Sequence, residues 1–198
     1  GRDVLLLQKL SELSGINILT NTAYYGGSDN KFLPQHTFQE TAQQLAARWT
    51  KEWEEGIEGT SGKPGFMKIS VNPGQLSSIS QKLVKAAAIA HLKTGLVIAS
   101  HTGPAVAASE EIEILHQEGV SPDAFIWVHA QNETDWTQYT QLARKGTWVS
   151  LDGLNDGNVS RYTEMLQYLK KEKCLHRTLI SHDAGWYEPG KPEGGNFR

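Results

Sequence analysis

The chain has 198 residues, a formal net charge of −3 and one cysteine, a length sufficient for one domain with a well-buried core. Its lysines and arginines are scattered rather than gathered in a basic stripe, so nucleic acid is not an expected partner. No apolar run approaches the ~20 residues of a membrane-spanning helix, and a single cysteine excludes an internal disulfide. We therefore expect one soluble globular domain over residues 1–198.

The N-terminal part of the chain predicts a helix, a strand and a second helix. Asp3 is a typical N-cap for a helix through VLLLQKLSEL, which Gly15 ends. Residues 16–25, INILTNTAYY, have the apolar, β-branched character of a buried strand. An amphipathic helix is predicted over residues 37–55, followed by a glycine-rich loop. The expected inner side of that helix consists of Phe38, Leu45, Trp49 and Trp53.

From residue 65 onward, apolar strands alternate with helices. Strands are predicted at 65–71, 95–101, 124–130, 147–153 and 177–185, with helices at 77–93, 105–117, 133–146 and 160–173. Continuous apolar runs are typical of parallel strands that are covered on both faces, so the pattern predicts an α/β protein. An open doubly wound sheet and a closed (β/α)₈ barrel both fit. No glycine-rich phosphate fingerprint follows any strand, which favours the barrel.

Lys68 lies in the middle of the apolar strand in KPGFMKISV. Burying its ammonium group is costly unless the charge is paired, removed or chemically used. Reaction with CO₂ would turn the amine into an anionic carbamate whose two oxygens can bridge two metal ions. Pairing with Asp183 is the simpler alternative.

Other polar residues follow the predicted strands at their carboxyl ends, where barrel enzymes carry their chemistry. They are His101, His129, Asp152 and Asp183. Period-two alternation places each candidate ligand on the same face as apolar residues of its own strand, so that His129 would share a face with Phe125 and Trp127. Two imidazoles, a carboxylate and a lysine predict a site for zinc, manganese or iron. Each residue alone also has a structural explanation, and Asp152 either holds a substrate or starts a loop.

The ordered segments GFMKIS, IASHTG, WVHAQ, SLDG and ISHDAGW resemble the phosphotriesterase-related family of the amidohydrolase superfamily. The resemblance implies a (β/α)₈ TIM barrel with two divalent metal ions, zinc first and manganese, iron or cobalt as alternatives. It implies carboxylated Lys68 as the metal bridge and His101 and His129 as ligands of one metal. Asp183 would be both a metal ligand and the catalytic proton acceptor.

The resemblance further implies a metal-dependent hydrolase in which a metal-activated hydroxide cleaves a lactone, a carboxylic ester or a phosphoester. The substrate would be a small molecule. Residues in the loops after the strands are the predicted substrate contacts, namely Tyr24, Tyr25, Asp152 and Trp186.

One family feature is missing from the sequence. The family's first strand ends in His-x-His, which supplies two further ligands, and no His-x-His occurs in these 198 residues. We therefore expect a single partial barrel that lacks the first two strands and the C-terminal segment. The alternative function is that of a truncated, catalytically incompetent fragment that binds at most one metal or needs the missing strands. The open edges of such a partial sheet could pair with a second copy of the chain, so a homodimer is possible.

Overall fold

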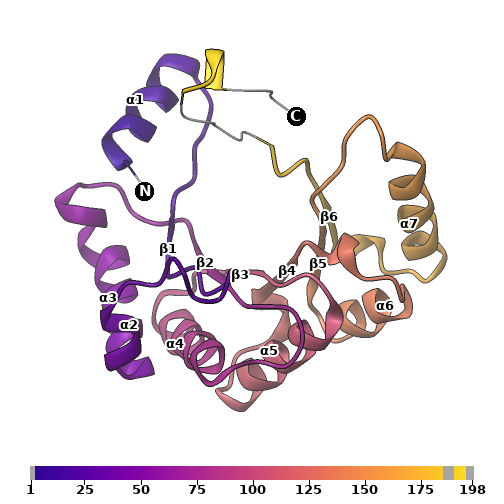
Figure 1. Cartoon of the computed structure of the whole chain (residues 1–198), viewed down its shortest axis with the longest axis horizontal. Helices are drawn as coiled ribbons and strands as arrows, with labels where there is room; N and C mark the ends of the chain where they lie inside the picture. The colour runs from indigo at the N-terminus through magenta and orange to yellow at the C-terminus, as the bar shows by residue number, and fades with distance from the viewer. Residues whose placement is uncertain (1–2, 185–189, 195–198) are drawn as a thin grey trace.

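Six strands lie side by side in chain order, and every pairing between neighbours is parallel. The computed structural model describes residues 3–184 and 190–194. The strands are β1 (Asn21–Thr22), β2 (Phe66–Ser70), β3 (Ile98–His101), β4 (Phe125–Val128), β5 (Trp148–Leu151) and β6 (Thr178–Ile180). They form a curved sheet rather than a flat one (Figure 1). The predicted α/β class with a parallel sheet is confirmed.

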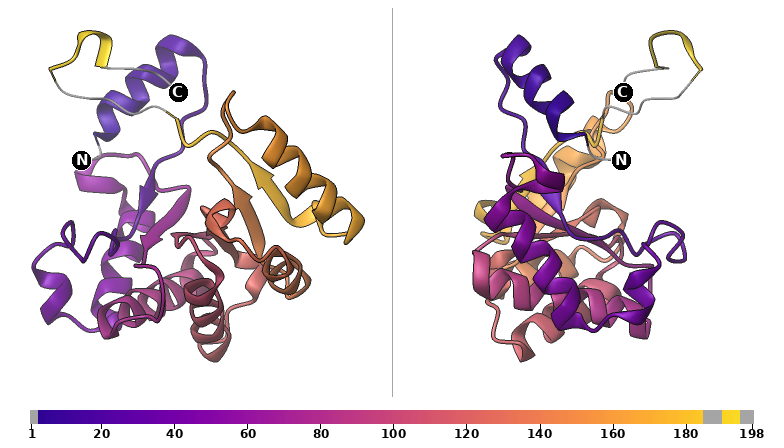
Figure 2. Two further views of the ribbon diagram at one scale, coloured as in Figure 1. Left: turned by 45° about the vertical axis from the view of Figure 1, so that its right-hand side comes forward. Right: turned by 90° about the vertical axis from the view of Figure 1, so that its left-hand side faces the viewer.

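The helices that connect successive strands lie along the outer side of the curved sheet, and one further helix precedes the first strand (Figures 1 and 2). The helices are α1 (Val4–Ser14), α2 (His36–Gln39), α3 (Ala42–Glu55), α4 (Ser78–Thr94), α5 (Ala105–Gln117), α6 (Thr137–Arg144) and α7 (Val159–Lys171). Short 3₁₀ turns occupy Ile57–Gly59, Pro122–Ala124, Ala130–Asn132, Leu175–Arg177 and Pro192–Gly194. Within the described ranges, no helix has the length and apolar character needed to cross a bilayer.

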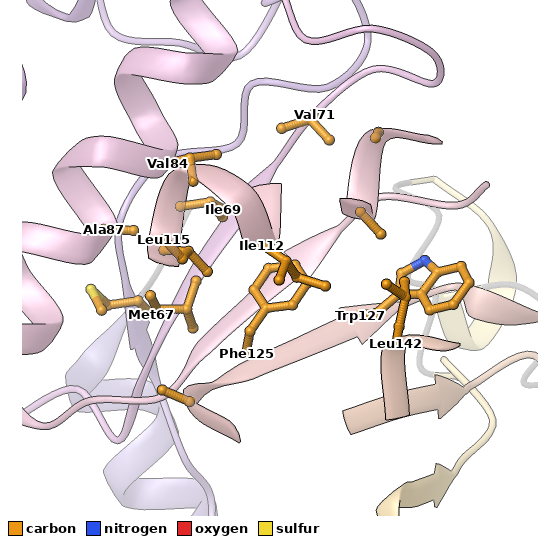
Figure 3. Packing of buried hydrophobic residues seen from close by; sticks show 14 of the residues in the cluster. Met67, Ile69, Val71, Val84, Ala87, Ile112, Leu115, Phe125, Trp127 and Leu142 are labelled. Carbon is orange, nitrogen blue, oxygen red and sulfur yellow. The ribbon is translucent and has the colours of Figure 1, made fainter. Parts of the chain in front are cut away.

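The hydrophobic core lies between the sheet and this outer layer of helices. Alternate residues of β2, Met67 and Ile69, are fully buried and belong to one cluster with Leu83 of α4 and Leu115 of α5. Figure 3 shows how Met67, Ile69 and Leu115 gather on this side of the sheet. Because side chains alternate along a strand, Lys68 points to the opposite, concave face.

The helix predicted from residue 4 is confirmed together with both of its end signals. The Asp3 carboxylate accepts a hydrogen bond of 3.0 Å from the Leu6 N–H, and Gly15 takes the left-handed conformation with φ 70°. These are the N-cap and C-cap geometries that Asp and Gly favour.

The buried strand predicted over residues 16–25 is wrong in extent and in burial. β1 covers two residues, with one isolated bridge between Tyr25 and Ser70 beyond it. The side chains before it are exposed, Ile16 by 63% and Leu19 by 73%. In the sheet described here β1 pairs with β2 alone. β-propensity reflects packing against neighbours on both sides, and one side is open at this position.

The single helix predicted over residues 37–55 is also wrong, because two helices occupy that stretch. Glu40 is extended, and Thr41 caps α3 by accepting a hydrogen bond from the Gln44 N–H, while the Gln44 side chain accepts one from the Thr41 N–H. This capping box starts a new helix and ends α2. Trp49 is buried on the inner side as predicted, whereas Phe38 is 49% exposed.

Two leucines of α4 test where the core lies. Leu83 is fully buried and Leu92 is 58% exposed. We predict that Leu83→Ala lowers the free energy of unfolding by about 2–5 kcal/mol because it leaves a cavity. Leu92→Ala is expected to change it by less than about 0.5 kcal/mol. Urea titration followed by circular dichroism measures both; equal losses for the two variants would contradict this placement of the core.

Candidate active site

The register of the sheet places the polar strand-end residues in neighbouring rows on the concave face. Lys68 of β2 pairs with Ala99 of β3, and two residues further along Ser70 pairs with His101. Met67 and Ile69 are buried against the helices on the other face. Lys68 and His101 therefore project from adjacent strands toward the same side, close to the carboxyl ends of those strands.

His129 reaches this side by a route that strand alternation does not predict. Phe125 and Trp127 are fully buried among the helices (Figure 3), so alternation alone would place His129 with them. The prediction that these three residues share a face is wrong. His129 lies just after β4 with φ 61° and ψ 32°, a left-handed conformation that turns its side chain away from that layer. Its ring contacts that of His101 edge-on, with 4.2 Å between the centroids.

Asp183 also lies beyond the end of its strand. β6 ends at Ile180, and Asp183 has φ 45°. Strand alternation therefore does not determine the direction of the Asp183 side chain. Its negative charge acts to raise the pKa of both Lys68 and His101, against the larger effect of burial.

Asp152, just after β5, is the hydrogen-bonding partner of His129. One carboxylate oxygen accepts a hydrogen bond of 2.6 Å from the His129 Nδ1–H, and the other accepts one of 2.9 Å from the His129 backbone N–H. Gln131 and Ser150 each donate a further hydrogen bond of 2.9 Å to the same carboxylate. These contacts place a proton on His129 Nδ1 and leave Nε2 as the ring nitrogen that can bind a metal.

Burial lowers the pKa of two nitrogen groups at the site, Lys68 and His101. Burial is the main cause that lowers the pKa of Lys68, opposed by the charges of Asp152 and Asp183. Burial and the neighbouring His129 and Lys68 lower the pKa of His101 to about 4, so its imidazole is neutral at pH 7. A neutral imidazole is the form that binds metal, and a neutral amine is the form that reacts with CO₂.

Asp152 is ionised at neutral pH. Burial acts to raise the pKa of Asp152, but hydrogen bonds from the side chain and backbone of His129 and from Gln131 outweigh it and lower the pKa to about 2. The Asp152 side chain is only 4% exposed. Its carboxylate therefore lies behind His129 rather than open to solvent.

The two adjacent tyrosines predicted as substrate contacts point to different places. The Tyr25 ring lies edge-on to His101 with 5.2 Å between centroids. The Tyr24 ring contacts Trp49 of α3, and its hydroxyl hydrogen-bonds His36 Nε2 at 3.0 Å. The structure thus brings Tyr25 to the histidines and packs Tyr24 into the helix layer. Trp186, the remaining candidate in this group, lies outside the described residues.

The side chains at this site are of the kinds that bind divalent metals, but they are too few to complete a metal site. His101 and His129 offer two imidazoles that touch each other, and Lys68 offers an amine with a lowered pKa. In the part of the chain that the structure describes, no three His, Cys, Asp or Glu side chains lie close enough together to hold a metal ion.

Some residues around the site were missed by the sequence analysis. Gln131 and Ser150 support Asp152, and Glu111 of α5 is fully buried behind β3. Glu111 had a recognisable signal, because it falls in the helical spacing of the buried residues of α5. Those residues are Ala107, Ala108, Glu111, Ile112 and Leu115.

The chain resembles known proteins in both sequence and structure. The profile of the Phosphotriesterase family matches residues 1–192. A phosphotriesterase homology protein of Escherichia coli is 28% identical over 201 residues, which cover 98% of this chain and 67% of that protein. An aryldialkylphosphatase of Saccharolobus solfataricus is 29% identical over 187 residues, which cover 92% of this chain and 59% of that protein.

Solved structures show the same relationship. The crystal structure of the Escherichia coli phosphotriesterase homology protein, with phosphate in its active site, matches with a TM-score of 0.85 at 26% identity. That match covers 92% of this chain and 63% of the other. A lactonase from Listeria monocytogenes matches with a TM-score of 0.84 at 27% identity, over 95% of this chain and 64% of the other.

The fold and these matches define an α/β protein of the (β/α)₈-barrel class, represented here by six consecutive strands. The chain belongs to the phosphotriesterase family, which lies within the amidohydrolase superfamily. It spans between 59% and 67% of the length of the relatives described above.

The lowered pKa of His101 predicts a pH dependence in the metal-free protein. Unfolded histidine takes up its proton near pH 6.5, whereas folded His101 does so at about 4. Between these values the unfolded state binds more protons, so the free energy of unfolding falls as pH is lowered. His101→Asn is expected to reduce this slope.

NMR titration of the His101 ring protons measures the same quantity directly, with assignment by the His101→Asn variant. We expect a midpoint near pH 4. A midpoint at or above the ordinary value would contradict the burial of the imidazole cation.

Proposed function

We propose that this chain carries the active-site face of a metal-dependent hydrolase that cleaves a lactone, a carboxylic ester or a phosphoester. The observation that supports this most is the contact between the imidazoles of His101 and His129, beside the Lys68 amine, whose pKa is lowered by burial. Relatives named as an aryldialkylphosphatase and a lactonase support the substrate classes.

Lys68 is proposed to act as a carbamate. Its neutral Nζ attacks the carbon of CO₂, an N–C bond forms, one C=O electron pair moves to oxygen, and the nitrogen loses a proton to solvent. The product carries one negative charge on two oxygens and can bridge two cations. The lowered pKa of Lys68 supports this step because the protonated amine has no lone pair to donate.

His101, His129 and Asp183 would hold two divalent metals together with this carbamate, with zinc as the first candidate and manganese, iron or cobalt as alternatives. When bound, such metals lower the pKa of water and polarise the substrate oxygen. Asp183 is proposed to accept the proton of the attacking water on its carboxylate and to pass it to solvent. Asp152 keeps His129 in the tautomer that offers Nε2.

The substrate is proposed to lie across the loops that follow β5 and β6. A cavity of about 650 Å³ is lined there by residues 154–157, Val159, His182 and Ala184. This volume is within the range of small-molecule sites. Tyr25, beside His101, would border the opposite side of the reacting group.

Hydrolysis of a panel containing lactones, aryl esters and a phosphotriester tests the proposal. We expect turnover of at least one class with zinc and bicarbonate present, and loss of turnover after chelation. Lys68→Ala and His101→Ala are each expected to reduce kcat by at least about a hundredfold. Lys85→Ala, at an exposed position of α4, is the matched control and should leave kcat unchanged. Turnover that survives both chelation and Lys68→Ala would contradict the proposal.

The alternative is that the 198 residues form a fragment that binds at most one metal or needs further strands. Two observations favour it: the ligand set in the described residues is incomplete, and the chain covers about two thirds or less of its relatives. Metal analysis distinguishes the two cases. Two zinc ions per chain together with turnover support the enzyme, whereas fewer than one zinc ion and no turnover support the fragment.

A further inference from the structure

Glu111 of α5 is a fully buried carboxyl group in the layer between helix and sheet. Such a position normally holds an apolar residue, because a carboxylate loses its hydration there. Burial raises the pKa of Glu111 to about 7, with the hydrogen bonds from Ser100 and Thr102 acting against it. Packing alone therefore does not explain why a glutamate occupies this buried position.

The Glu111 carboxyl group hydrogen-bonds the two residues that flank His101 in the chain. The Ser100 hydroxyl donates to one carboxylate oxygen, and the Thr102 hydroxyl donates to the other at 2.7 Å. Ser100 and Thr102 are themselves buried on the helix side, at 0% and 2% exposure. His101, between them, points to the concave face. The carboxyl group therefore holds the backbone on both sides of His101 from behind.

Other hydrogen bonds nearby restrain the loop after β3, but they do not replace the link from Glu111 to Ser100 and Thr102. The Trp127 indole N–H donates to the Gly103 carbonyl at 2.6 Å, and the Glu133 carboxylate accepts from the Ala105 N–H at 2.9 Å. The first bond ties the loop after β3 to β4 itself, and the second ties the start of α5 to the loop after β4. At Ser100 and Thr102, the side-chain link to a helix is provided by Glu111.

We propose that Glu111 is a positioning residue that fixes the orientation of His101 for metal binding, acting through the hydroxyls of Ser100 and Thr102. The inference rests on the proposed function, since it assigns His101 as a ligand. Supporting groups behind metal ligands typically contribute 10- to 100-fold to metal affinity, and we expect a loss of about that size when Glu111 is removed.

The test compares four variants of the full chain. Glu111→Ala removes the link, and Glu111→Gln keeps the shape and offers one acceptor and one donor to the two hydroxyls. Leu115→Ala, one turn further along α5 and equally buried, destabilises the same helix without touching Ser100 or Thr102. Glu113→Ala removes an exposed carboxylate of that helix. Free energies of unfolding are measured for all four.

Zinc affinity by competition with a chelator is the first readout. Glu111→Ala should bind zinc about 10- to 100-fold more weakly than wild type, and Glu111→Gln should recover most of the loss. Leu115→Ala and Glu113→Ala should bind as wild type does. If Glu111→Ala binds no more weakly than Leu115→Ala, Glu111 is only a stabilising residue and the proposal is wrong.

NMR of the metal-free protein is the second readout and does not depend on the proposed function. The His101 ring lies 4.2 Å from that of His129 and 5.2 Å from that of Tyr25, so cross-relaxation between these rings is expected in wild type. Glu111→Ala should lose it, and Leu115→Ala should keep it. If wild type binds no zinc, the hydrolase proposal fails while this readout still decides the role of Glu111.

Thr102→Val covers the case in which Glu111→Ala does not fold. It removes one hydroxyl, keeps the side-chain shape and leaves Glu111 in place. We expect it to weaken zinc binding and to shift the His101 ring resonances in the same direction as Glu111→Ala, by a smaller amount. Unchanged zinc affinity and unchanged His101 resonances in this variant would overturn the proposal.

Discussion

The parallel register of the six strands is the constraint on which the site depends. Because all strands run in one direction, their carboxyl ends lie along one edge of the curved sheet, and the residues that follow them meet there. Ser70 pairs with His101, and His101 pairs with Val128. The carboxyl ends of β2, β3 and β4 are therefore aligned. A slip of one residue on β3 would turn His101 into the helix layer and Ser100 to the concave face.

Burial and hydrogen bonding then determine the charge of each group at that edge. The same partly buried environment that keeps His101 neutral also lowers the pKa of Lys68. Asp152 stays ionised there because four hydrogen bonds stabilise its carboxylate. The outcome is a buried anion that orients His129, beside the neutral imidazole of His101. This arrangement suits cation binding, since metal ligands must be unprotonated.

The sequence predicted the sheet, the order of its elements and the residues at the strand ends, because apolar runs and helical periodicity are local signals. It failed where tertiary context decides. Ile16 and Leu19 look like core residues but are exposed in the segment that precedes β1. The side of the sheet that His129 occupies depends on a positive φ that strand periodicity does not encode. Asp152 was recognised as polar, yet its partner is 23 residues away in the chain, which only the fold reveals.

A crystal structure of the chain grown with zinc and bicarbonate tests the central claim most directly. Anomalous scattering at the zinc edge would locate the metal independently of the protein coordinates. The account predicts zinc at about 2.0–2.1 Å from Nε2 of both His101 and His129, with density for a carbamate continuing from Lys68 Nζ toward the metal. Zinc bound elsewhere on the surface, with Lys68 ending in an unmodified amine, would contradict it.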